Sequence, residues 1–145
     1  MSNPTAQKFG YPATLIADAG AWLVLLRPQQ PTFGSLVLVC KEPAGAFSEL
    51  SAEAFAGLQV AVQGAERALG ALVGYERINY LMLMMVDRDV HFHVIPRYAG
   101  VREFEGLSFP DAGWPGQPAL SSAVELSQAQ LQALRRKLAA LWPQP

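Results

Sequence analysis

Apolar and polar residues alternate strictly between residues 89 and 94, and this stretch contains both histidines of the chain. An alternation with a period of two is typical of a strand that buries one face. We therefore expect the apolar side chains to point into a core and the polar ones to form a row on the opposite face. The apolar set is Val90, Phe92 and Val94, and the polar set is Asp89, His91 and His93. Because Pro96 cannot donate a hydrogen bond to a neighbouring strand, regular pairing should stop there.

Apolar runs predict four further strands, at residues 14–17, 21–26, 36–40 and 78–86. The run at 36–40 is nearly continuous, which favours a central strand covered on both faces. Residues 18–20 have the composition of a turn between the first two strands. A tight turn at 86–89 should lead from the fourth strand into the histidine strand.

Two stretches have helical periodicity. Ser51 is a favourable N-cap, and apolar residues then recur every three or four positions until Gly74, which predicts a helix from about 52 to 73. A last helix is expected at about 126–142. Residues 1–12 and 98–120 are rich in glycine and proline and predict an irregular arm and a long loop. We thus expect a single α+β domain over 1–145, with a five-stranded, mainly antiparallel sheet, one long helix across it and a C-terminal helix.

Composition narrows the class of protein. The chain has 145 residues, and its 51% hydrophobic content implies extensive apolar burial, for example at a subunit interface. The longest apolar run, 81–86, is too short to span a membrane. Eleven basic and twelve acidic residues argue against a general nucleic-acid binder. One cysteine excludes an internal disulfide, and residues 1–5 lack the apolar core of a signal peptide, so we expect a cytoplasmic protein.

Residues 90–97 read Val-His-Phe-His-Val-Ile-Pro-Arg. This stretch resembles the signature of the histidine triad (HIT) superfamily, which is His-φ-His-φ-His-φ-φ with φ apolar, often followed by Pro-Arg. His91 takes the middle position, His93 takes the last, and Asp89 stands where the first histidine belongs. Segments 34–41 and 47–51 also resemble the superfamily, over a total of about 22–98. The branch indicated is the fragile-histidine-triad, dinucleoside polyphosphate hydrolase-like one.

The resemblance implies a HIT-like fold, a homodimer and a nucleotide hydrolase or nucleotidyl transferase that needs no cofactor. In such proteins the middle histidine attacks the α-phosphate of a nucleotide or dinucleoside polyphosphate, and water or another acceptor resolves the nucleotidyl-histidine. A neutral imidazole suits this role because the phosphoramidate it forms is labile. The expected catalytic residues are His91, His93 and Asp89, and the expected substrate-binding residues are Arg27, Arg88 and Ser35.

Three other interpretations remain open. The histidines could be ordinary surface residues, or Asp-x-His-x-His could bind a metal, although a regular strand places Asp89 and His93 ~13 Å apart at their Cα atoms. The chain could also be a nucleotide-binding module that has lost turnover. That interpretation is favoured by Asp89 and by a loop of only residues 86–88 before the histidines. On a regular strand Asp89 would lie ~6.6 Å from His91, would favour the protonated form of His91 and would repel an anionic substrate.

In the long loop, Trp114 could be a lid over a base or a dimer contact.

Overall fold

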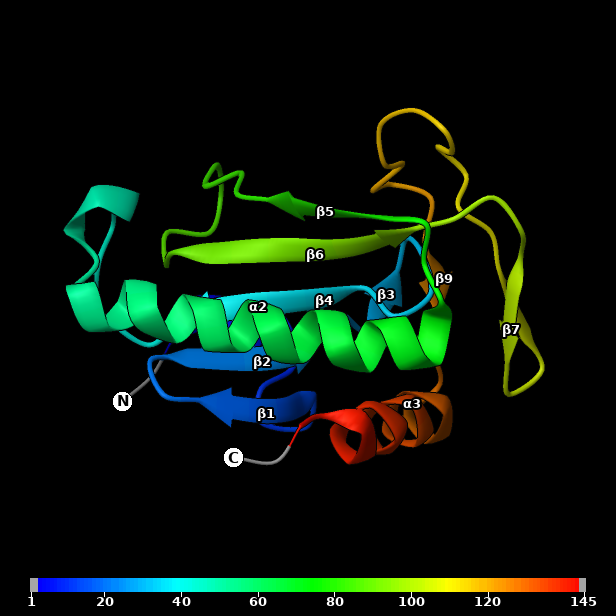
Figure 1. The fold of residues 1–145 in the computed structure, drawn as a ribbon, viewed down its shortest axis with the longest axis horizontal. Helices are drawn as coiled ribbons and strands as arrows, with labels where there is room; N and C mark the ends of the chain where they lie inside the picture. The colour runs from blue at the N-terminus through cyan, green and yellow to red at the C-terminus, as the bar shows by residue number, and fades with distance from the viewer. Residues whose placement is uncertain (1–2, 144–145) are drawn as a thin grey trace.

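The computed structural model describes residues 3–143, and its centre is a five-stranded sheet with the order β1-β2-β4-β6-β5 (Figure 1). Every neighbouring pair in this sheet is antiparallel. The strands are β1 (Leu15–Ala19), β2 (Trp22–Leu26), β4 (Leu36–Cys40), β5 (Arg77–Leu81) and β6 (His91–Arg97). The expected α+β architecture is confirmed.

One face of the sheet is covered by α2 (Ala52–Val73), which runs along the strands, while α3 (Gln128–Leu141) packs near β1 (Figure 1). The predicted limits of α2 are confirmed. The Ser51 side chain accepts a hydrogen bond from the N–H of Ala54, and Gly74 ends the helix with a left-handed φ of 61°. The main core lies between α2, α3 and this face, and it includes Trp22, Leu38 and Val94.

A short helix, α1 (Pro4–Lys8), belongs to a second, smaller apolar cluster on the opposite face. The prediction of an irregular arm over 1–12 was therefore wrong for these residues. Asn3 caps the helix by accepting from the N–H of Ala6, and Pro4 has the fixed φ that suits a first helical position. The cluster consists of Ala6, Phe9, Leu23, Leu25, Val37 and Val39.

The strands around the histidines differ from the prediction at their ends. β5 stops at Leu81 and β6 starts at His91, so the connecting loop is 82–90 and not the three residues 86–88. Pairing also continues past Pro96, which lies opposite Ile78 of β5. The β4–β6 ladder ends before Pro96, with Leu36 opposite Val94, so Pro96 has a paired neighbour on one side only. A proline is tolerated at such a position.

The 98–120 loop contains more structure than its composition indicated. It includes a hairpin of β7 (Arg102–Phe104) and β8 (Leu107–Phe109), whose two turn residues both have positive φ. Two short strands, β3 (Gln29–Gln30) and β9 (Val124–Glu125), pair with each other. None of the helices within residues 3–143 has the length and apolarity that a membrane crossing requires.

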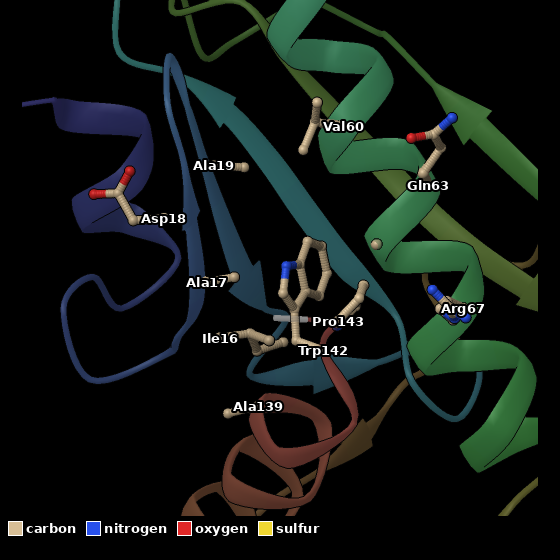
Figure 2. A pocket seen from close by; sticks show the side chains of 11 residues that line it. Ile16, Ala17, Asp18, Ala19, Val60, Gln63, Arg67, Ala139, Trp142 and Pro143 are labelled. Carbon is tan, nitrogen blue, oxygen red and sulfur yellow. The ribbon is translucent and has the colours of Figure 1, made fainter. Parts of the chain in front are cut away.

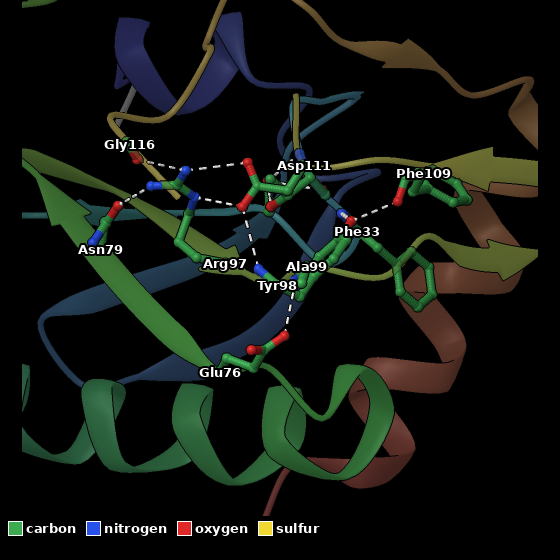
Figure 3. Close-up of polar contacts among 11 residues, drawn as sticks. Phe33, Glu76, Asn79, Arg97, Tyr98, Ala99, Phe109, Asp111 and Gly116 are labelled. Atoms are coloured by element: carbon green, nitrogen blue, oxygen red, sulfur yellow. Dashed lines mark hydrogen bonds and ion pairs between the residues drawn. The ribbon is translucent and has the colours of Figure 1, made fainter. Parts of the chain in front are cut away.

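Arg97 anchors the part of this loop that follows the hairpin (Figure 3). Its Nε donates to Asp111 Oδ2 at 2.7 Å, and its Nη1 and Nη2 donate to Asn79 Oδ1 and the carbonyl of Gly116, each at 2.8 Å. The two charged side chains of this ion pair keep only 5% and 1% of their surface exposed. A buried guanidinium with this many acceptors holds the loop against the end of β6.

Candidate functional site

His91 and His93 lie on the face of the sheet that carries α1, opposite Val39 and Val37 of β4. They are only 2% and 7% exposed. The Phe9 ring packs on them, with centroid distances of 6.5 Å to His91 and 5.7 Å to His93, and the two imidazoles are 5.3 Å apart. The interpretation of the histidines as ordinary surface residues is therefore wrong.

The orientation of His91 is set by the main chain. Its Nδ1 lies 2.7 Å from the carbonyl oxygen of Asp89. A carbonyl oxygen only accepts, so Nδ1 carries the proton and donates it. The neutral ring then has its lone pair on Nε2, which is the nitrogen able to act as a nucleophile or a base.

His93 has a different environment. Burial lowers its pKa to about 4, with further lowering by the charges of Arg27 and His91. Its Nδ1 is buried and has no hydrogen-bond partner among residues 3–143. His93 is consequently neutral near pH 7, and it can donate one N–H hydrogen bond without carrying a positive charge.

Asp89 lies before the regular strand that carries the two imidazoles. The regular strand starts two residues later, and the chain bends at Asp89, so that its Oδ2 accepts from the N–H of Thr5 at 3.2 Å. Thr5 belongs to α1, on the face that also carries the imidazoles, and a catalytic role of the Asp89 carboxylate stays a prediction. What Asp89 offers to His91 is its carbonyl oxygen. Within residues 3–143, no three His, Cys, Asp or Glu side chains are grouped so that they could hold a metal ion.

Arg27 brings a positive charge to this face. Its Nε and Nη1 are buried without a hydrogen-bond partner in the described part of the chain, and burial lowers its pKa. The guanidinium carbon lies 5.9 Å from the centroid of the Phe9 ring. Both residues line a pocket of about 290 Å³. The other lining residues are Lys8, Pro28, Gln29, Glu125 and Leu126.

The other two predicted substrate-binding residues lie apart from this pocket. Ser35 is fully buried, and its hydroxyl donates to the carbonyl of Thr32 at 2.9 Å, so it is engaged inside its own loop. The preceding Gly34 has a φ of +84°, and a Cβ there would lie 2.8 Å from Leu69 of α2. Arg88 is exposed on the 82–90 loop.

Sequence reasoning missed three residues near the histidines. Phe9 and Lys8 come from the arm predicted to be irregular, and Asp87 comes from the loop that was predicted too short. Lys8 Nζ and Asp87 Oδ2 form an ion pair of 2.8 Å. No periodic pattern in the sequence indicated these contacts, since they join segments 79 residues apart.

Two other hollows are formed by different parts of the chain. A groove of about 490 Å³ is lined by β1, α2 and the end of α3, where the Trp142 ring packs against Gly64 (Figure 2). A wider hollow of about 700 Å³ follows β5 and includes Trp114 and Leu81. In the wider hollow, Leu81 is the strand partner of His93, and Trp114 lines this hollow and not the pocket that contains Arg27.

No family model matches the sequence, and no curated protein matches it. Solved structures do match. A histidine triad protein of Sinorhizobium meliloti 1021 superposes with a TM-score of 0.76 at 20% identity, over 97% of this chain and 96% of that one. The chain has the histidine triad fold. A histidine triad protein of Bradyrhizobium japonicum gives a TM-score of 0.74 at 19% identity, over 98% and 97%. The diadenosine triphosphate hydrolase of Plasmodium falciparum also shares the HIT fold, with a TM-score of 0.64 at 10% identity over 89% and 76%.

Proposed function

We propose that this protein is a nucleotide hydrolase or nucleotidyl transferase that acts at an α-phosphate through a nucleotidyl intermediate on His91. The observation that carries the proposal is the 2.7 Å contact between His91 Nδ1 and the carbonyl of Asp89. It fixes the tautomer whose Nε2 has the lone pair needed for attack on phosphorus. The HIT fold and the two histidines on one strand face support the same chemistry.

The reaction would take two steps. Nε2 of His91 attacks the α-phosphorus, a P–N bond forms, and the bond from phosphorus to the leaving-group oxygen or nitrogen breaks. Water or another acceptor then attacks the same phosphorus, and the P–N bond breaks to release His91. His93 is neutral, so its role is to donate an N–H hydrogen bond to a phosphate oxygen, and a bound anion would raise its proton affinity.

The pocket of about 290 Å³ is our candidate for the nucleoside. Phe9, Pro28 and Leu126 supply apolar surface for a base, while Arg27 supplies charge on the side where Phe9 meets His93. A substrate with an apolar ring joined to an anionic group fits this distribution. The Plasmodium falciparum structure is named as a diadenosine triphosphate hydrolase, which supports testing dinucleoside polyphosphates first.

A second candidate function is nucleotide binding without turnover. It is favoured by Asp89, whose carboxylate faces Thr5, so that the first position of the triad offers no imidazole to the site. The length of the loop before His91 does not favour it, because this loop spans 82–90.

The test is incubation with diadenosine polyphosphates and with alkyl or aminoacyl nucleotide amidates, followed by measurement of nucleoside monophosphate release. The intermediate should be trapped at neutral or basic pH, because phosphoramidates hydrolyse in acid, and mapped by mass spectrometry to His91. His91→Ala should abolish both signals, and His93→Gln should slow them. Release that persists in His91→Ala would refute the assignment of the nucleophile. Binding without release by the wild type would favour the second candidate.

A homodimer is also part of this proposal. Several apolar side chains remain exposed in the single chain, among them Met85 at 85% and Val86 at 80%. Light scattering at micromolar concentration tests it, and a monomeric mass would contradict it.

A further inference from the structure

Lys8 and Asp87 form an ion pair close enough to His93 for both charges to act on it. Lys8 ends α1, and its Nζ lies 5.7 Å from the centroid of Phe9, the ring that packs on both imidazoles. Asp87 belongs to the 82–90 loop, and its side chain is only 18% exposed although it carries a charge. The contact of 2.8 Å therefore joins α1 to the loop at the site.

The charges of Lys8 and Asp87 both act on His93. Burial, Arg27 and His91 account for most of the lowered pKa of His93, and smaller contributions come from Asp87, which raises it, and Lys8, which lowers it. The charges near His93 thus include Arg27, Lys8 and Asp87, and Glu125 adds a second carboxylate to the pocket that Lys8 and Arg27 line. In the empty site Lys8 is already paired with the carboxylate of Asp87, so a phosphate group would have to compete with Asp87 for Lys8.

We propose that Asp87 acts as an internal substitute for the substrate phosphate, and that Lys8 exchanges Asp87 for a phosphate oxygen when a nucleotide binds. Lys8 is then a further substrate-binding residue, and its pair with Asp87 is a latch that holds the empty site closed. This inference rests on the proposed function, because it places the phosphate beside His91 and His93.

The 82–90 loop has the properties that such an exchange requires. Two polar contacts join it to α1, namely Lys8 to Asp87 and the Thr5 N–H to Asp89. Met82 and Met84 pack against the main core, whereas Met85 and Val86 are exposed and contribute little packing within the chain. Release of Asp87 would therefore free residues 85–88, between the packed Met84 and Asp89, while the carbonyl of Asp89 keeps its bond to His91.

The proposal predicts opposite effects from removing the two halves of one ion pair. Adenosine 5′-monophosphate, and inorganic phosphate in a second series, are titrated by calorimetry against the wild type, Lys8→Met and Asp87→Asn. Lys8→Met should weaken binding about tenfold, since a charged hydrogen bond to phosphate is lost. Asp87→Asn should strengthen binding about fivefold, since the competing anion is gone. Lys8→Arg keeps the charge and should bind nearly as well as the wild type.

The chain offers a matched control in the exposed pair of Lys41 and Asp18, with an N–O distance of 2.6 Å. Lys41→Met and Asp18→Asn should leave binding unchanged. A purely structural pair would make Lys8→Met and Asp87→Asn shift binding in the same direction, and that result would overturn the latch. So would equal affinities in all variants, or no binding of either probe by the wild type.

The two proposals fail separately. Turnover through His91 without opposite effects at Lys8 and Asp87 refutes the latch alone. Opposite effects on binding without a nucleotidyl-His91 refute the catalytic proposal alone. Hydrogen exchange of residues 82–90 adds a direct readout, because saturating adenosine 5′-monophosphate should increase exchange there in the wild type but not in Asp87→Asn.

Discussion

The low pKa of His93 predicts a specific loss of stability in mild acid. An imidazole with an ordinary pKa of 6.5 in the unfolded chain and about 4 in the folded protein takes up its proton preferentially on unfolding. Stability is therefore complete above pH 6.5 and declines as the pH falls from 6.5 towards 4. Proton linkage between these two pKa values lowers the free energy of unfolding by about 2 kcal/mol at pH 5 relative to pH 7.5. The value is an upper limit because the site can relax around the charged ring and admit water, and we therefore expect about 1 kcal/mol.

The assay is urea unfolding of the wild type and His93→Gln at pH 7.5 and pH 5.0. The carboxylates and His91 are common to both proteins, so the difference between them isolates the titration of His93. The wild type should lose about 1 kcal/mol more than the variant over this interval. With only two histidines in the chain, NMR of the imidazole Cε1–H resonances offers an independent readout. Equal losses in both proteins, together with a His93 resonance that titrates near pH 6.5, would refute the reasoning.

Two further predictions concern stability around the site. Asp111→Ala leaves the buried Arg97 without its carboxylate, so the free energy of unfolding should fall by about 3–5 kcal/mol, measured by urea unfolding; a loss below about 1 kcal/mol would show that the pair is solvated. Asp89→Ala removes the acceptor of the Thr5 N–H but keeps the carbonyl bonded to His91. It should cost about 1 kcal/mol of stability and leave the rate of His91 nucleotidylation close to that of the wild type; a rate as low as that of His91→Ala would contradict this.

Elements with strong local signals could be predicted from the sequence. The α2 helix has a capping serine, a helical apolar stripe and a terminating glycine, so both ends agreed with the structure. The alternation at Val90, Phe92 and Val94 correctly placed the two histidines on the other face from these side chains. In each case the local pattern and the packing of the element favour the same conformation.

Contacts between segments that are far apart in the sequence could not be predicted from local patterns. Nothing in residues 82–86 marks the end of β5, because the apolar run continues through Val86 while the paired strand stops at Leu81. The alternation likewise continues to Asp89, although the chain bends there to reach Thr5. The position of Phe9 over the imidazoles depends on a five-residue helix whose stability comes from tertiary packing.

His91 and His93 lie on one strand face, but their neighbouring groups give the two imidazoles different hydrogen bonds and different proton affinities. The Nδ1–H of His91 donates to the main-chain carbonyl of Asp89, which leaves the lone pair on Nε2. Burial keeps His93 uncharged, and Arg27 beside it opposes protonation until an anion arrives. A bound phosphate would reverse that balance, because it pairs with Arg27 and favours a proton on His93 at the same time. In the proposed mechanism, His91 would attack through Nε2 as soon as substrate binds, whereas His93 would become a proton donor only when a phosphate is present.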